Sequence, residues 1–215
     1  MTRVKICGIR TPAAARAAAE AGADAVGFVF YPPSPRSVDP ARAVELARLL
    51  PPFVLRVGVF VNAPVSVVRR IADGVGLDLV QLHGDEPPEL CARMPRRVIK
   101  AVRVEGPEAL QRARTYTDCA LLLDAHVPDR YGGTGRSFDW SLVRGMDRPV
   151  ILSGGLTPEN VAQAIRHARP YAVDVSSGVE TDGEKDPRKI AAFVRAVRQA
   201  DMELERRNSL QEVPP

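Results

Sequence analysis

The residues whose types could do chemistry stand at the ends of short apolar segments. The first is Cys7, which ends the run Val4-Lys5-Ile6-Cys7 and is followed by Gly8, where the chain can turn away. In α/β enzymes the carboxyl ends of the strands collect the catalytic groups. A thiol in this place can be presented to a ligand, although an isolated cysteine is more often simply buried.

Asp124 has a matching position, directly after the apolar residues 121–123. Loss of water around a carboxylate disfavours its charged form and suits it to general acid catalysis. The structural alternative is a carboxylate that caps the following loop. Cys7 and Asp124 are far apart in the order of the strands, so they could flank a ligand. A base on one side and an acid on the other is the layout for moving a proton between two atoms of a substrate.

Two turns near the end of the chain have the composition of a phosphate site. Gly154 and Gly155 precede a predicted helix opened by Thr157, and Ser177 and Gly178 follow the next strand. Glycine lets backbone N–H groups approach an anion closely, and a helix N-terminus adds its dipole. In barrels, the loops after strands 7 and 8 are the recurrent phosphate site. We therefore predict phosphate binding there, the alternative being two ordinary turns.

Further polar residues stand in loops at the same ends. Arg36 lies in a loop stiffened by three prolines, which suits bidentate capture of a carboxylate, although a lone loop arginine is usually solvated. For His83 we expect orientation of its neighbours rather than proton shuttling. Asp174 ends the last predicted strand. The glycine-rich residues 132–136 indicate a flexible loop beside these groups and are only a weak phosphate motif.

The elements that must position these residues alternate along the chain between apolar runs and runs of helical periodicity. The predicted strands are 3–7, 25–30, 54–61, 78–82, 97–102, 119–124, 149–152 and 172–175. The predicted helices lie near 12–21, 40–50, 64–73, 86–93, 107–114, 139–144, 158–168 and 187–200. Several begin with a capping residue and a proline, as at Thr11-Pro12 and Asp39-Pro40.

Eight strands, each followed by a helix, predict an α/β fold with a parallel sheet. A closed (β/α)8 barrel and an open doubly wound sheet both fit, and the count of eight favours the barrel. No Gly-x-Gly-x-x-Gly follows the first strand, which disfavours a dinucleotide site. We expect one catalytic domain over residues 1–200, and a fraying helix end with a mobile C-terminal tail over residues 201–215.

Composition narrows the class of protein further. The formal net charge is +4, with basic residues scattered and aromatic residues at 5%, so a small anionic substrate is as good an explanation as nucleic acid. The three cysteines have no paired spacing, which predicts neither a disulfide framework nor a metal site. No apolar run approaches the ~18 residues of a membrane span, and the start lacks the pattern of a signal peptide. We expect a cytoplasmic protein that binds neither membrane nor nucleic acid, as a monomer or homodimer.

With these residues assembled, the chain resembles the phosphoribosylanthranilate isomerases of tryptophan biosynthesis. The matching segments run in order through nearly the whole chain: Lys5-Ile6-Cys7-Gly8-Ile9, residues 22–28, Ser34-Pro35-Arg36, residues 57–62, Val80-Gln81-Leu82-His83-Gly84, Leu123-Asp124, residues 132–135, Ser153-Gly154-Gly155-Leu156 and residues 173–180. The set is highly specific, although several of its members are weak alone.

The resemblance implies a (β/α)8 barrel that catalyses an Amadori rearrangement without a metal or organic cofactor. By position, Asp124 is the general acid and Cys7 the general base. Arg36 holds the anthranilate carboxylate, and the 154–155 and 177–178 turns hold the phosphate. His83 and Asp174 have supporting roles.

A free thiol is a poor base at neutral pH. We therefore predict either that the pKa of Cys7 is lowered or that the substrate proton is strongly acidified. Arg10 stands where the family often has Thr or Ser, and its charge could lower the pKa of the thiol.

Two other functions compete. Another sugar-phosphate barrel, such as an indoleglycerol-phosphate synthase or a ribonucleotide-imine isomerase, would share the phosphate turns. Such enzymes usually place lysine and glutamate, or paired aspartates, at the chemical positions, where this chain has Cys7 and Asp124. A non-catalytic scaffold barrel would predict a broken acid–base pair.

Overall fold

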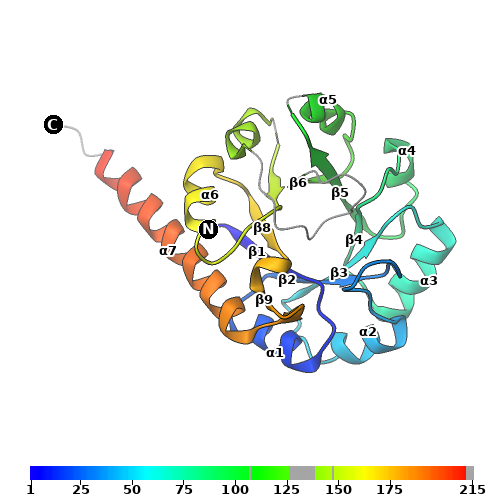
Figure 1. Ribbon diagram of the computed structural model, residues 1–215. Helices are drawn as coiled ribbons and strands as arrows, with labels where there is room; N and C mark the ends of the chain where they lie inside the picture. The colour runs from blue at the N-terminus through cyan, green and yellow to red at the C-terminus, as the bar shows by residue number, and fades with distance from the viewer. Residues whose placement is uncertain (107, 126–138, 147, 212–215) are drawn as a thin grey trace.

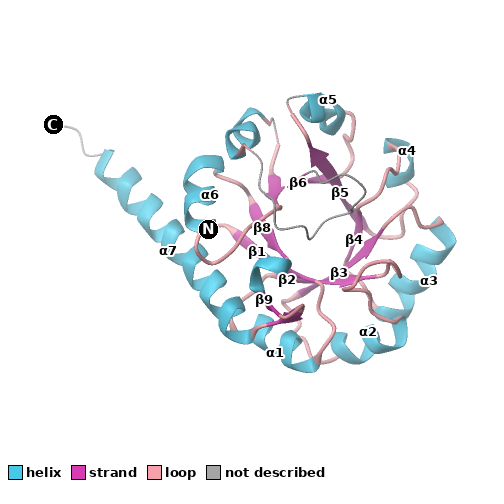
Figure 2. Ribbon diagram, viewed as in Figure 1, coloured by secondary structure: helices cyan, strands magenta, loops and turns pink. Residues whose placement is uncertain are grey.

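The computed structural model describes residues 1–106, 108–125, 139–146 and 148–211, which form a closed barrel of eight parallel strands in the order β1 to β8. The strands form a central ring with the helices outside it (Figures 1 and 2). β1 pairs with both β2 and β8, which closes the barrel and excludes an open sheet. The barrel expected from the count of strands is confirmed.

The elements follow the predicted alternation. The barrel strands are β1 (Arg3–Cys7), β2 (Ala25–Val29), β3 (Leu55–Phe60), β4 (Leu79–Leu82), β5 (Arg97–Val104), β6 (Ala120–Ala125), β7 (Val150–Leu152) and β8 (Ala172–Val175). The helices are α1 (Pro12–Glu20), α2 (Pro40–Ala47), α3 (Val65–Val75), α4 (Pro88–Cys91), α5 (Glu108–Arg114), α6 (Val161–Ala168) and α7 (Pro187–Gln211), with 3-10 turns η1 (Trp140–Gly145) and η2 (Ser177–Val179). A short hairpin, β9 (Glu180–Thr181) and β10 (Glu184–Lys185), follows η2.

The two faces of each strand bury different side chains. The inner face fills the barrel with an apolar cluster that includes Leu122 and Ala172, while a larger cluster packs the outer face against the helices. Side chains two positions apart on a strand share a face. Asp124 and Asp174 therefore face the interior as well, one layer nearer the carboxyl ends of the strands. The apolar layer beneath supports this polar layer.

Several helices differ from their predicted limits. The run 86–93 forms only the short α4, and 139–144 forms the 3-10 turn η1. The helix predicted from 158 begins at Val161. Asn160 is the cause, because its side chain accepts from the Thr157 N–H and donates to the Gly155 carbonyl, each at 2.8 Å. These bonds hold residues 157–160 in a turn against the glycine loop.

The C-terminal helix is longer than predicted. α7 continues through Gln211, so a helix end at residue 200 is wrong, while residues 212–215 lie outside the described part of the chain. The buried Asp201 accepts two hydrogen bonds from Thr2, one from its N–H and one from its hydroxyl, both 2.7 Å long. Residue 201 therefore ties α7 to the start of β1. Within the described residues no helix has the length and apolar character to span a membrane.

Candidate active site

Cys7 is the last residue of β1, at the mouth of the barrel, as predicted. Its side chain is buried and packs in a small cluster with Val29 and Val59. Gly27 is its register partner on β2. A Cβ at Gly27 would lie 2.8 Å from Cys7 Sγ, so the missing side chain makes room for the thiol.

Lys5 accompanies Cys7 on the same face of β1. Its Nζ forms a buried ion pair with Asp174 Oδ1 of β8 at 2.8 Å. The same Cβ at Gly27 would lie 3.2 Å from Lys5 Nζ, which places the ammonium beside the thiol. Burial opposes the charge on Lys5, but Asp174 and Cys7 outweigh it and raise the pKa of Lys5. A cation and an anion thus stand next to Cys7 inside the barrel.

The pKa of Cys7 is raised rather than lowered. Burial is the main cause and Asp174 adds to it, while Lys5 and Lys185 act in the opposite direction. Arg10 is occupied elsewhere, since it donates to the Pro35 carbonyl at 2.7 Å and pairs with Glu184 at 2.5 Å. The predicted lowering of the thiol pKa is therefore wrong. The other alternative, a strongly acidified substrate proton, stays a prediction.

Asp124 lies near the end of β6 and is buried at the mouth. Its Oδ2 lies 3.1 Å from His83 Nε2, and His83 Nδ1 lies 2.8 Å from the side-chain nitrogen of Gln81. An amide nitrogen only donates, so Gln81 leaves Nε2 as the protonated ring nitrogen facing Asp124. His83 thus contacts the candidate acid directly, and its orienting role stays a prediction.

The loop that carries His83 is held by a buried ion pair. Lys100 Nζ lies 2.8 Å from Glu86 Oε2, and both side chains are at most 3% exposed. Glu86 also accepts from the backbone N–H groups of Asn62 and Gly84, at 2.8 and 2.9 Å. Because breaking such a pair leaves a buried charge without a partner, these contacts stabilise the observed position of the loop. His83 is thereby fixed against Asp124.

The two turns predicted to bind phosphate lie against each other. A Cβ at Gly178 would lie 1.8 Å from the Leu156 carbonyl oxygen, so only glycine fits where the turn after β8 meets the turn after β7. Gly154 has φ +89°, and a Cβ there would lie 3.1 Å from Asp124 Oδ1. The Gly154–Gly155 and Ser177–Gly178 turns therefore come together beside the candidate acid. Residues 132–136 lie outside the described residues.

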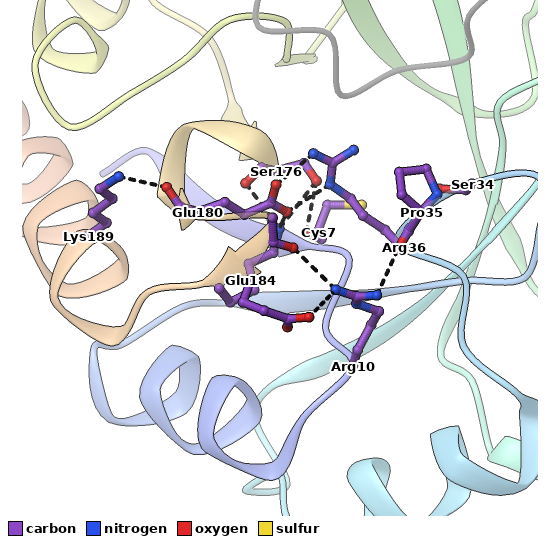
Figure 3. A network of polar contacts seen from close by, with 11 residues as sticks. Cys7, Arg10, Ser34, Pro35, Arg36, Ser176, Glu180, Glu184 and Lys189 are labelled. Carbon is purple, nitrogen blue, oxygen red and sulfur yellow. Dashed lines mark hydrogen bonds and ion pairs between the residues drawn. The ribbon is translucent and has the colours of Figure 1, made fainter.

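Arg36 is paired with a carboxylate of the protein itself. Its Nε and Nη2 donate to Glu180 Oε1 and Oε2 at 2.7 and 2.6 Å. Figure 3 shows Arg36 lying over Cys7, with Glu180 reaching it from the hairpin after β8. Lys185 donates to Glu180 as well, and to the Ser176 carbonyl at 3.0 Å. The solvated alternative for Arg36 is wrong, since its side chain is 16% exposed.

Sequence reasoning missed several of these residues. Lys5 could have been found from strand alternation, because it stands two residues before Cys7. Gln81 stands two residues before His83 in the same way. Glu180 and Lys185 gave no such pattern, because they lie in a hairpin whose contact with Arg36 spans 144 residues.

A parallel barrel with a thiol, a buried acid and two glycine turns at the carboxyl ends of its strands defines a (β/α)8-barrel enzyme. The family model of N-(5′-phosphoribosyl)anthranilate (PRA) isomerase matches residues 4–196. This chain belongs to that family and is an isomerase.

Individual relatives agree with this membership. The N-(5′-phosphoribosyl)anthranilate isomerase of Geotalea daltonii is 52% identical over 202 residues, which is 93% of this chain and 98% of that protein. A structure of monomers generated from the dimeric enzyme of Thermotoga maritima is 45% identical, with a TM-score of 0.84 over 93% of this chain and 100% of that one. A further isomerase structure, in complex with reduced 1-(o-carboxyphenylamino)-1-deoxyribulose 5-phosphate, is 47% identical with the same TM-score of 0.84 and the same coverage of 93% and 100%.

Proposed function

We propose that this protein converts N-(5′-phosphoribosyl)anthranilate to 1-(2-carboxyphenylamino)-1-deoxyribulose 5-phosphate in tryptophan biosynthesis. One observation carries the proposal. In the closed strand order, β7 and β8 lie between β6, which carries Asp124, and β1, which carries Cys7. The glycine turns after β7 and β8 therefore lie between the acid and the base, where they can anchor the phosphate of a sugar whose other end reaches both groups.

Asp124 is the general acid of the first step. Its carboxyl group donates a proton to the ring oxygen of the ribose, the bond from that oxygen to C1′ breaks, and the nitrogen lone pair forms the C1′=N iminium. Burial and the contact with His83 at 3.1 Å hold the carboxyl group in one place. The ring-opened iminium keeps its positive charge on the substrate.

Cys7 is the general base of the second step. Its thiolate form takes the proton from C2′ and becomes a neutral thiol, and the electron pair of that C–H bond forms the C1′=C2′ enolamine while nitrogen becomes neutral. The enolamine then gains a proton at C1′ and loses one from the C2′ hydroxyl, which leaves the ketone. The iminium acidifies the C2′ proton. This compensates for the small thiolate fraction that the raised pKa of Cys7 leaves at neutral pH. The substrate nitrogen serves as the electron sink, so the reaction needs no cofactor.

The other residues bind the two ends of the substrate. Arg36 receives the anthranilate carboxylate, and Gly154, Gly155, Ser177 and Gly178 hold the phosphate through their backbone N–H groups. Asp174 keeps Lys5 at the base through their 2.8 Å ion pair.

Growth of an auxotroph tests the proposed substrate. A bacterial strain that lacks its own isomerase should grow without tryptophan when it expresses this chain, and the same strain with Cys7→Ser should not. A histidine-requiring strain that lacks the ribonucleotide-imine isomerase should not be rescued. Soluble protein without growth in the first strain, or growth in the second strain alone, would contradict the substrate assignment.

The cellular location, partners and oligomeric state of the enzyme are also part of the proposal. We propose a cytoplasmic protein whose partner is a small phosphorylated substrate, with no nucleic acid or membrane partner. Of the two oligomeric states, the homodimer has support from the relative described as dimeric and from Phe53, a 94% exposed aromatic residue beside a cavity of about 820 Å³. Sedimentation equilibrium separates the dimer from the monomer.

A further inference from the structure

Arg36 offers only part of its guanidinium group to a ligand. Nε and Nη2 are taken by Glu180, and within the described residues Nη1 has no hydrogen-bond partner. The aliphatic part of the Arg36 side chain is confined as well, because it lies close to the backbone of Gly8. A Cβ added at Gly8 would lie only 2.9 Å from Arg36 Cδ. Nη1 is therefore held in a fixed direction rather than swinging with the side chain.

Glu180 is anchored from several directions. Its carboxylate accepts from Lys185. Its backbone carbonyl accepts from Lys189 at 2.6 Å, a contact drawn in Figure 3. Lys185 also donates to the carbonyl of Ser176, whose hydroxyl donates to the Cys7 carbonyl at 3.1 Å. The contacts run from the base, through the hairpin, to Arg36.

The charges of this cluster suit an anionic ligand. Arg36 and Lys185 are two cations around the single carboxylate of Glu180, so one positive charge is left over. Burial opposes the charge on Glu180, but hydrogen bonds from Arg36 and Lys185 outweigh it and lower the pKa of Glu180. Glu180 thus stays ionised at neutral pH and holds both cations in place, while one net positive charge remains in the cluster.

Displacement of Glu180 by an incoming carboxylate would be costly. Its side chain is 8% exposed and that of Lys185 is 3% exposed, so separating them would leave buried charges without partners. The alternative, in which Glu180 only blocks Arg36 until substrate arrives, requires this unfavourable separation of buried charges.

We propose that Glu180 is a positioning residue which holds Arg36 so that its remaining N–H edge selects a ligand carrying the aromatic carboxylate. The inference rests on the proposed role of Arg36. It adds that selection for the carboxylate depends on a residue that does not touch the ligand. It also predicts that loss of the Glu180 charge weakens selection, although that loss makes the cluster more positive.

Calorimetry with a matched pair of ligands tests the proposal. The first ligand is reduced 1-(o-carboxyphenylamino)-1-deoxyribulose 5-phosphate, which a related isomerase binds in its solved structure. The second is the same compound made from aniline, which lacks the carboxyl group. The ratio of the two dissociation constants measures selection for the carboxylate and does not depend on catalysis.

Glu180→Gln should reduce this ratio by about tenfold or more, the size expected for losing a charge-assisted contact, and should change the affinity for the aniline compound by less than about twofold. Glu184→Gln is the control, because Glu184 lies in the same hairpin but is 61% exposed and pairs with Arg10. That variant should keep the wild-type ratio. Glu180→Asp retains the charge with a shorter reach and should also lower the ratio, which keeps the test available if Glu180→Gln does not fold.

Two outcomes separate this inference from the proposed function. If Arg36→Met brings the ratio of the two dissociation constants close to one while the Glu180 variants keep or increase the wild-type ratio, Glu180 does not position Arg36 and the inference is overturned. If Arg36→Met leaves the ratio unchanged, the assigned role of Arg36 fails first, and the inference fails with it.

Discussion

Replacement of Thr2 by Val removes a single buried hydroxyl from the contact that ties α7 to β1. The hydroxyl donates to Asp201 Oδ1 at 2.7 Å, while the Thr2 N–H donates to Oδ2. Valine has nearly the same shape, so packing is retained and only the hydroxyl bond is lost. Both residues are buried, at 6% and 7% exposure, so water does not easily replace the missing donor.

The cost of this change follows from the charge and burial of Asp201. A hydrogen bond to a charged group contributes about 1.5–3 kcal/mol, and an acceptor left unsatisfied loses that contribution. Because Asp201 keeps its second bond from Thr2 N–H, we expect a loss of about 2 kcal/mol in the free energy of unfolding. For a chain of this size, such a loss lowers the melting temperature by roughly 4–8 °C.

Thermal and urea unfolding measure the loss, and Thr181→Val is the matched control. Thr181 makes the same kind of bond, with its hydroxyl 2.9 Å from Asp186 Oδ2, but it is exposed to water. That control should change stability by no more than about 0.5 kcal/mol. Equal effects of the two variants would refute the reasoning, because burial would then have no influence on the value of the bond.

Three further predictions follow from the site and its surroundings. Gly178→Ala should raise the KM for substrate at least about tenfold, because its Cβ would clash with the Leu156 carbonyl and separate the two phosphate turns; an unchanged KM would place the phosphate elsewhere. Alkylation of Cys7 by iodoacetamide should rise about tenfold per pH unit and level off only above the ordinary thiol pKa of ~8.5, because burial raises the pKa of Cys7; a plateau near neutral pH would contradict this. For Asp24, burial opposes ionisation, but bonds from Arg3, the Val4 N–H and Arg198 outweigh it and lower its pKa. The stability that Asp24 contributes should therefore be present above its unfolded pKa of ~3.9 and be lost as the pH falls through the lower folded value; acid titration of wild type and Asp24→Asn should converge below that range, and a constant difference would argue against it.

The sequence predicts the barrel well because its cues are local. The Thr11 side chain accepts from the Ala14 N–H and the Asp39 side chain from the Ala41 N–H, and each precedes a proline in the first turn of its helix. These caps fix helix starts without any distant contact. The apolar strand runs likewise show where each chemical residue emerges, which is why Cys7 and Asp124 could be placed at the mouth.

The parts that could not be predicted depend on residues far apart in the chain. Asp201 begins the segment without clear apolar periodicity, and its role depends on Thr2, 199 residues away. The Lys5–Asp174 pair spans 169 residues, and no local spacing indicates it. The raised pKa of Cys7 could not be predicted either, because it is set by burial and by charges that only the closed barrel brings together.

The decay of fluorescence of freshly prepared phosphoribosylanthranilate is the most direct test of the acid–base pair. Wild type should accelerate the decay, and Cys7→Ser and Asp124→Asn should each lose at least about a hundredfold in kcat with little change in melting temperature. Cys91→Ser, at a buried cysteine outside the mouth, should retain wild-type turnover. Full turnover by folded Cys7→Ser or Asp124→Asn would contradict the proposed roles of the thiol and the carboxyl group.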